Sequence, residues 1–159
     1  MTARTFAGAA AVTLQSLLLL LALTAVNTSA GQEPVSEDKP FAENFILLQL
    51  SDQDPGKQDA VLDVANNLIK HYESPDLVDI EIVAFGPGIH LLIAGNTREA
   101  RISSLVESGV RFVGCMNTVD SLELATGKRP ELNEHTIPVQ TGVAHLVKRV
   151  REGYVPVRP

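Results

Sequence analysis

The sequence predicts a parallel α/β domain with helices on both faces of its sheet. Short apolar runs that suit buried strands alternate along the chain with segments whose apolar residues recur at helical spacing. The first run, residues 45–50, is almost continuously apolar, as expected of a central strand covered on both faces. Glycine and proline mark most of the boundaries between the runs. Strand and helix in alternation favour parallel pairing, because parallel strands need a crossover connection.

Residues 1–30 are predicted to be a secretory signal peptide. Arg4 precedes an apolar run over residues 6–26, and Thr28-Ser29-Ala30 supplies small residues suited to cleavage. The protein is therefore expected to be periplasmic or secreted, with no membrane association after cleavage. An uncleaved membrane anchor is the alternative, because the apolar run is long enough to span a bilayer.

Residues 31–43 are predicted to be a flexible linker. This stretch contains Pro34, Pro40 and several charged residues, and it has no apolar periodicity. Residues 44–159 then form one α/β domain, a length that supports a single well-packed core.

The first two strands and their helices have clear boundaries. Asp54 is a candidate N-cap, and the apolar stripe of the helix that follows it extends to Tyr72. Residues 78–85 form the next predicted strand, which Gly86-Pro87-Gly88 breaks. Residues 89–94 suit a short buried helical segment.

The second half of the domain continues the alternation. A helix with capping-box-like spacing at Asn96 and Glu99 is expected to end at Gly109, before a third strand over residues 110–114. Thr118 is a candidate cap for the helix after that strand. The remaining predictions are a short strand at 136–139, a helix capped by Thr141 and ended by Gly153, and an edge strand at 154–157.

Composition and motifs exclude several functional classes. The net charge of −6 and the aromatic content of 4% argue against nucleic-acid binding. The turn Gly86-Pro87-Gly88 lacks the spacing of a dinucleotide fingerprint, and the chain has no P-loop or G-x-S-x-G motif. No cofactor is predicted, and the histidine spacing indicates no metal site. The basic residues Lys148, Arg149 and Arg151 are expected to be a solvated helix face.

Cys115 is the candidate catalytic residue. It is the single cysteine of the chain, and it lies where a predicted strand ends and a helix begins. A helix N-terminus lowers the pKa of a nearby thiol and so favours the thiolate. A buried, inert cysteine is the alternative, because free cysteine often packs as a small hydrophobe.

The carboxyl ends of parallel strands share one edge of a sheet, where ligands bind in open α/β folds. The loops at 51–54, 86–88 and 115–118 follow three predicted strands. The candidate pocket residues beside Cys115 are therefore Asp52, Gly86, Pro87, Gly88, His90, Asn117 and Thr118. Structural interpretations compete with this one: Asp52 and Asp54 flank a helix start, and His90 suits a hydrogen-bonded core histidine. A further alternative makes His90 the general base for Cys115, which requires the two side chains to be within hydrogen-bonding reach.

The chain resembles the DsrE/DsrF-like family, and most closely its small exported branch. The resemblance rests on Phe45–Leu50, on Val83–Gly88, and on Gly109–Phe112 leading into Cys115-Met116-Asn117-Thr118. It covers nearly the whole domain, and its most specific part combines the Gly-Pro-Gly turn with the Cys-x-Asn-Thr exit. The resemblance implies a flavodoxin-like three-layer sandwich around a mainly parallel five-stranded sheet. It also implies a homo-oligomer, a trimer or hexamer.

In the sulfur-relay members of this family, DsrE and TusD, a cysteine after the third strand carries sulfane sulfur as a persulfide, and Cys115 matches that position. The implied function is persulfide carriage or related thiol chemistry, with a sulfurtransferase-like activity if the protein is an enzyme. The implied partners are sulfur donor and acceptor proteins. The alternative is a non-catalytic periplasmic binding or assembly module in which Cys115 is structural.

Overall fold

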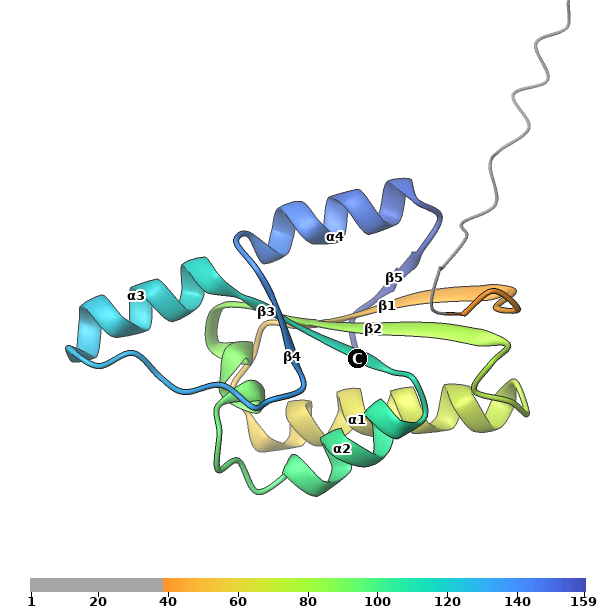
Figure 1. Cartoon of the computed structure of the whole chain (residues 1–159), viewed down its shortest axis with the longest axis horizontal. Helices are drawn as coiled ribbons and strands as arrows, with labels where there is room; N and C mark the ends of the chain where they lie inside the picture. Colours follow the sequence, from red (N-terminus) through yellow and green to blue (C-terminus); the bar gives the residue numbers. More distant parts are fainter. Residues whose placement is uncertain (1–38) are drawn as a thin grey trace, which may run out of the picture. The chain divides into compact units, whose positions relative to one another are not determined.

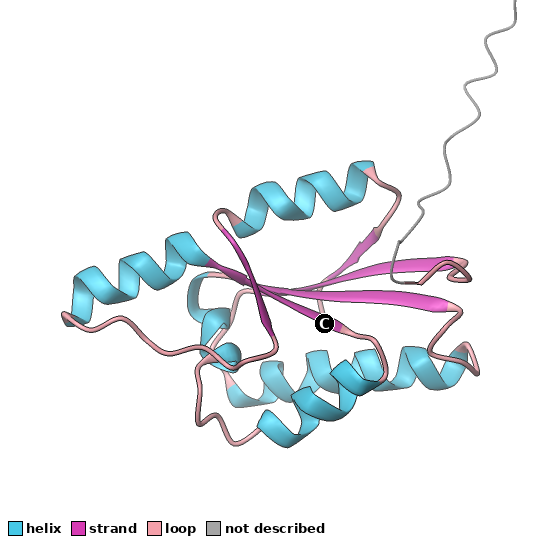
Figure 2. Cartoon of the chain, viewed as in Figure 1, coloured by secondary structure: helices cyan, strands magenta, loops and turns pink. Residues whose placement is uncertain are grey.

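The computed structural model describes residues 39–159, which form one domain with helices on both sides of a five-stranded sheet (Figures 1 and 2). The strands are β1 (Asn44–Leu50), β2 (Val78–Ala84), β3 (Arg111–Cys115), β4 (Thr136–Val139) and β5 (Val155–Val157). The helices are α1 (Pro55–His71), α2 (Glu99–Glu107), α3 (Met116–Thr126) and α4 (Gly142–Arg151), with a 3₁₀ helix, η1 (Gly86–Leu92), after β2. The predicted signal peptide and residues 31–38 of the predicted linker lie outside the described residues.

All four strand pairings are parallel, and the strand order is β4-β3-β2-β1-β5. The predicted flavodoxin-like α/β class is confirmed. The chain steps in one direction from β1 to β4 and then returns across the sheet to β5. Right-handed crossovers in opposite directions place their helices on opposite faces. Accordingly, α1 and α2 lie on one face and α4 on the other, while α3 extends away from the end of β3 (Figure 1).

The face covered by α1, α2 and η1 contains the main apolar core. Alternate residues of β1 and β2 point to this face, including Leu48 and Ile82, and Phe112 of β3 joins them; all three are fully buried. Helix α1 adds Val61 and Leu62 from one stripe, as its helical spacing predicts. This face therefore closes by burial of apolar side chains.

The opposite face, under α4, combines a smaller apolar cluster with charged side chains. Leu47, Val83 and Val113 form the apolar part, and Leu146 of α4 packs against them. The central strand β2 also points Asp79 and Glu81 to this face, and both are almost completely buried. We call the following group the charged cluster: Asp79, Glu81, Arg111, His145, Arg149 and Tyr154.

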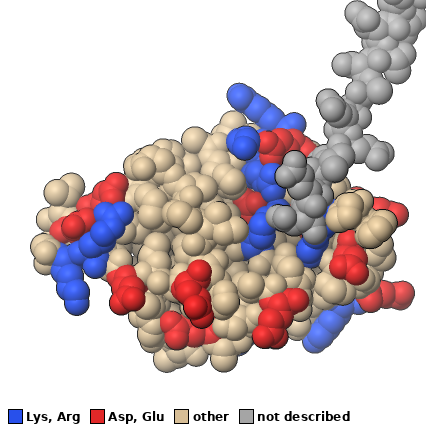
Figure 3. All heavy atoms as spheres, viewed as in Figure 1, with Lys and Arg blue, Asp and Glu red and all other residues tan. Residues whose placement is uncertain are grey.

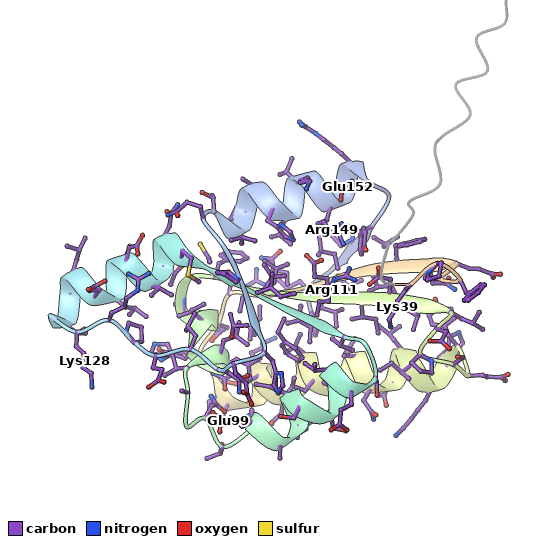
Figure 4. All side chains as sticks on the ribbon, viewed as in Figure 1. Lys39, Glu99, Arg111, Lys128, Arg149 and Glu152 are labelled. Carbon is purple, nitrogen blue, oxygen red and sulfur yellow. The ribbon has the colours of Figure 1, made fainter. Side chains whose placement is uncertain are left out.

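The charged cluster corrects the expectation that Arg149 belongs to a solvated face. The Arg149 side chain is 20% exposed, donates to Glu81, and lies 4.1 Å from the centre of the Tyr154 ring. Arg111 and Arg149 lie in the layer between the sheet and α4 (Figure 4). Lys148, at 69% side-chain exposure, does face solvent as expected. The sequence spacing of α4 alone does not distinguish these two neighbours, because their environment depends on the carboxylates of β2.

The described end of the predicted linker is attached to the domain. Lys39 Nζ donates hydrogen bonds to the carbonyl oxygens of Pro75 and Val78, at 2.7 and 2.9 Å. Burial lowers the pKa of Lys39, while the nearby Asp79 carboxylate opposes that shift. Within residues 39–159, no helix has the length and apolar character needed to cross a bilayer.

Candidate functional site

Cys115 lies at the carboxyl end of β3, where it is the N-cap residue of α3. It is 6% exposed, and its side chain points to the same face of the sheet as Arg111 and Val113. The helix begins earlier than expected, because Thr118 is in its first turn rather than at the cap. Cys115 therefore occupies the N-cap position of α3, although its side chain makes no capping hydrogen bond with the backbone of that helix.

A second helix N-terminus reaches the same sulfur. The N–H of Gly142, the first residue of α4, donates to Cys115 Sγ at 3.2 Å. The carbonyl oxygen of Gln140 lies 3.8 Å from Sγ and accepts the thiol proton when Cys115 is neutral. Helices α3 and α4 both begin where neighbouring strands end, so their positive ends converge on one side chain.

These donors lower the pKa of the Cys115 thiol below its ordinary value. Burial opposes ionisation and is the largest single influence, but the N–H of Gly142, the hydroxyl and N–H of Thr118, and the N–H of Asn117 together outweigh it. The thiolate is the nucleophilic form of cysteine, so this arrangement favours reactivity.

Thr118 links the thiol to the turn after β2. Its Oγ1 accepts the Gly86 N–H at 2.9 Å, which leaves its single proton free to be donated toward Cys115. Gly86 adopts a φ of +51°, in the left-handed region that glycine enters without strain. The structure therefore brings together three of the predicted pocket residues, Gly86, Thr118 and Asn117, around Cys115.

Asn117 holds the loop between β4 and α4. Its backbone N–H donates to the Gln140 carbonyl at 3.0 Å, and its side-chain amide donates to Thr141 Oγ1 at 3.1 Å. Gln140 Nε2 in turn donates to Asn117 Oδ1 at 2.6 Å. Thr141 is the N-cap residue of α4, as expected, but its hydroxyl bonds to Asn117 instead of an α4 backbone amide.

The other predicted pocket residues have different surroundings. Gly88 packs so closely on β1 that an added Cβ would lie 2.2 Å from the Leu50 carbonyl oxygen, and Pro87 is exposed in the first turn of η1. Asp52 and His90 line a separate surface hollow with Gln53, Asp54 and Pro55. No hydrogen bond found within residues 39–159 joins His90 to Cys115.

Gln140, Thr141 and Gly142 are site residues that the sequence interpretation did not include. A signal for them was present, because residues 136–139 were expected to be a strand and Thr141 a helix cap. The loop between them had to reach the same sheet edge as Cys115 if the strand was parallel. No group of three or more histidine, cysteine, aspartate or glutamate side chains in the described part of the chain is arranged to hold a metal ion.

The chain is similar to the solved structure of a protein of unknown function from Methanobacterium thermoautotrophicum. The two share 28% sequence identity with a TM-score of 0.65, and the match covers 74% of this chain and 100% of that protein. No family model matches the chain, and no curated protein matches it closely enough to indicate a relationship. The structural similarity supports the α/β fold described above.

Proposed function

We propose that the protein is an exported DsrE-like sulfur carrier that uses Cys115 as its nucleophile. The observation that carries the proposal is the position of Cys115 Sγ between the N-termini of α3 and α4, with the Gly142 N–H at 3.2 Å. Two converging helix N-termini stabilise a negative charge on sulfur. They would stabilise the thiolate before sulfur transfer and the persulfide anion after it.

The proposed reaction is a pair of sulfur transfers. The Cys115 thiolate attacks the outer sulfur of a donor persulfide or polysulfide, and a new S–S bond forms at Cys115. The donor S–S bond breaks, and the electron pair leaves with the donor thiolate. An acceptor thiolate then attacks the outer sulfur of the Cys115 persulfide. The S–S bond at Cys115 breaks, the outer sulfur stays on the acceptor, and Cys115 is released as a thiolate. Atoms, electrons and charge balance in both steps without a cofactor.

Intact-mass analysis tests this proposal directly. The purified protein is treated with polysulfide, freed of excess reagent and weighed beside a Cys115→Ser variant. We expect wild type to gain the mass of one or more sulfur atoms, and the variant to remain unchanged. Absence of an adduct on wild type, or an equal adduct on both proteins, would contradict sulfur carriage through Cys115.

The non-catalytic alternative is favoured by one observation, the 6% exposure of Cys115. If the cysteine is a packing residue, a thiol reagent should modify it slowly in the native protein, and the pH profile should be that of an ordinary thiol. Because the chain has one cysteine, the alkylation rate reports on Cys115 without interference. Rapid alkylation at neutral pH would count against the structural role.

We include self-association in the proposal, as a trimer or hexamer. Helix α4 exposes Val143, Val147 and Val150, which are 52%, 46% and 43% exposed and lie on one face by their spacing. Figure 3 shows a broad area without charged side chains on one face of the molecule. Light scattering coupled to size exclusion measures the mass. A monomeric mass at high protein concentration would contradict this part of the proposal.

Export is the last part of the proposal. It rests on the predicted signal peptide at residues 1–30, which the structure does not describe. Intact mass and N-terminal sequencing of protein recovered from a secreting host identify the first residue. A protein that begins at Gly31 agrees with cleavage, whereas retention of the apolar run in a membrane fraction supports the uncleaved anchor.

A further inference from the structure

Polar contacts contribute a large share of the attachment of helix α4 to the sheet. Val143, Val147 and Val150 are about half exposed, so their burial contributes little to holding the helix in place. Leu146 is the α4 side chain in the apolar cluster of this face. Two further inward residues, His145 and Arg149, both contact one carboxylate, that of Glu81.

Glu81 is almost fully buried, at 2% exposure, on the central strand β2. Its Oε1 contacts His145 Nε2, and its Oε2 accepts from Arg149 Nε at 3.1 Å. Arg111 of β3 also approaches Oε2, at 3.4 Å. A buried carboxylate with several partners is costly to leave unpaired, which favours the position of α4 that supplies them.

The helix that Glu81 holds is also the helix that contacts the thiol. His145 lies one turn after Gly142, and its backbone N–H donates to the Thr141 carbonyl at 3.0 Å. The fit at Gly142 is close, because an added Cβ would lie 3.1 Å from the Cβ atoms of both Cys115 and Phe85. A small displacement of the first turn of α4 would therefore change the hydrogen bond from Gly142 to Sγ.

We infer that Glu81 is a positioning residue for Cys115: by holding His145 and Arg149, it keeps the first turn of α4 seated so that the Gly142 N–H points at Sγ. The inference deepens the proposed function and rests on it for its biological meaning. Glu81 does not touch the sulfur in this arrangement. Its effect on the thiol passes through α4, because the helix contacts Glu81 on β2 and Cys115 on β3.

Asn117 limits the size of the expected effect. It holds Gln140 and Thr141 from the side of α3, independently of Glu81. Removing the negative charge of Glu81 should therefore weaken the hydrogen bond from the Gly142 N–H to Sγ without breaking it. The donors from Thr118 and Asn117 itself also remain.

The test compares Glu81→Gln with Asp79→Asn by the pH dependence of Cys115 alkylation. Both replacements remove one buried carboxylate from the same face of β2, two residues apart, and preserve side-chain volume. Among the described residues, Asp79 contacts Arg111 and Tyr154 and no side chain of α4 directly, and it reaches the helix only through the bond from Arg149 to the Tyr154 hydroxyl, so it is the matched control. The midpoint of the rate against pH reports the thiol pKa, and the plateau rate reports access to the sulfur.

We expect Glu81→Gln to raise the Cys115 midpoint, so that alkylation at neutral pH slows about three- to tenfold, the change that half to one pKa unit produces. Asp79→Asn should leave the rate within about twofold of wild type, because it does not release α4. Equal shifts in the two variants, or an unshifted midpoint in a folded Glu81→Gln protein, would overturn the inference.

A second variant covers the case in which Glu81→Gln does not fold. His145→Gln removes the imidazole from a side chain that is 19% exposed and leaves Glu81 paired with Arg149 and Arg111. It should raise the midpoint by a smaller amount in the same direction, and no shift would overturn the inference.

Sulfur loading separates this inference from the proposed function. If the variants shift the alkylation midpoint as expected but polysulfide adds no sulfur to wild type, positioning by Glu81 stands and sulfur carriage fails. If wild type gains sulfur and Glu81→Gln shows an unshifted midpoint, sulfur carriage stands and the positioning role fails.

Discussion

The two faces of the sheet are closed in different ways. Under α1, α2 and η1, the strands present apolar side chains that are fully buried. Under α4, the same strands present a small apolar cluster and buried carboxylates paired with Arg111 and Arg149. Apolar burial is nondirectional, whereas hydrogen-bonded charges hold a helix at a defined position. The Cys115 thiol lies on the second face, where the Gly142 N–H at the start of α4 donates to Sγ.

Adjacent leucines of β1 provide the strongest test of this difference. Leu47 and Leu48 are both fully buried, and they point to opposite faces. We expect Leu48→Ala to lower the free energy of unfolding by about 4 kcal/mol and Leu47→Ala by about 3 kcal/mol. The loss depends on how far neighbouring side chains relax into the cavity, and we expect more relaxation in the smaller apolar cluster around Leu47. Urea denaturation at fixed pH measures both.

A larger loss for Leu47→Ala would reverse the comparison. It would show that the face under α4 is packed as rigidly as the main core. Equal m-values for the two variants are needed for the difference to report native-state stability.

Arg111→Met tests the charged part of the second face. Burial opposes the charge on Arg111, but Asp79, with help from Tyr154 and Glu81, raises the pKa of the guanidinium. Removing it leaves Asp79 with Tyr154 and leaves Glu81 with the α4 side chains. We expect a loss of about 2 to 3 kcal/mol of unfolding free energy, below the value for a fully buried pair because Arg111 is 16% exposed.

The same denaturation measurement checks this prediction, with Arg129→Met as the control. Arg129 forms ion pairs with Asp120 and Glu123 on α3, but it is 47% exposed. Exposed pairs contribute about 0 to 1 kcal/mol, so the control should be near neutral. Similar losses for the two variants would mean that burial adds little to the charged cluster.

Gly142→Ala tests the contact between the second face and the thiol. The added methyl group meets Cys115 and Phe85 at 3.1 Å, so α4 must shift slightly. We expect a loss of about 1 to 2 kcal/mol from overpacking. We also expect a higher midpoint in the pH dependence of Cys115 alkylation, because the shift of α4 moves the backbone N–H of residue 142 away from Sγ.

Gly56→Ala is a suitable control, since it also replaces a glycine near the start of a helix. It should leave the Cys115 midpoint unchanged. A Gly142→Ala protein with the wild-type midpoint would show that the donor is not important for the thiolate.

The sequence predicted the fold better than it predicted the site. The apolar runs defined each strand closely, and Asp54 caps α1 as expected, accepting the Lys57 N–H at 3.1 Å. Cys115 was recognisable because a strand ends there. Gly142 was not recognisable as a site residue, since its contact with the sulfur arises from the return of the chain across the sheet after β4.

The charged cluster could not be predicted from the sequence either. Asp79 and Glu81 alternate with apolar residues in β2, a pattern that usually indicates a half-exposed strand. Their partners come from β3, α4 and the residue before β5, which are separated by 30 to 75 positions. Such pairings become evident once the strand order is known, because register then fixes which side chains share a face.

The smallest expected effect is the pH dependence of the stability that the Cys115 thiolate contributes. The folded protein lowers the thiol pKa, whereas the thiol pKa in the unfolded chain is about 8.5. The thiolate therefore stabilises the fold fully above the unfolded pKa, and this contribution is lost as pH falls through the folded pKa. The difference in unfolding free energy between wild type and Cys115→Ser should rise from pH 6 to pH 9, by about 1.4 kcal/mol for each pH unit by which folding lowers the thiol pKa. Tyr154, whose pKa burial raises, is common to both proteins and cancels in the difference.

Denaturation under reducing conditions measures the effect. A difference that stays constant over this range would show that the donors from α3 and α4 do not favour the thiolate, and the second face would then differ from the first in charge alone.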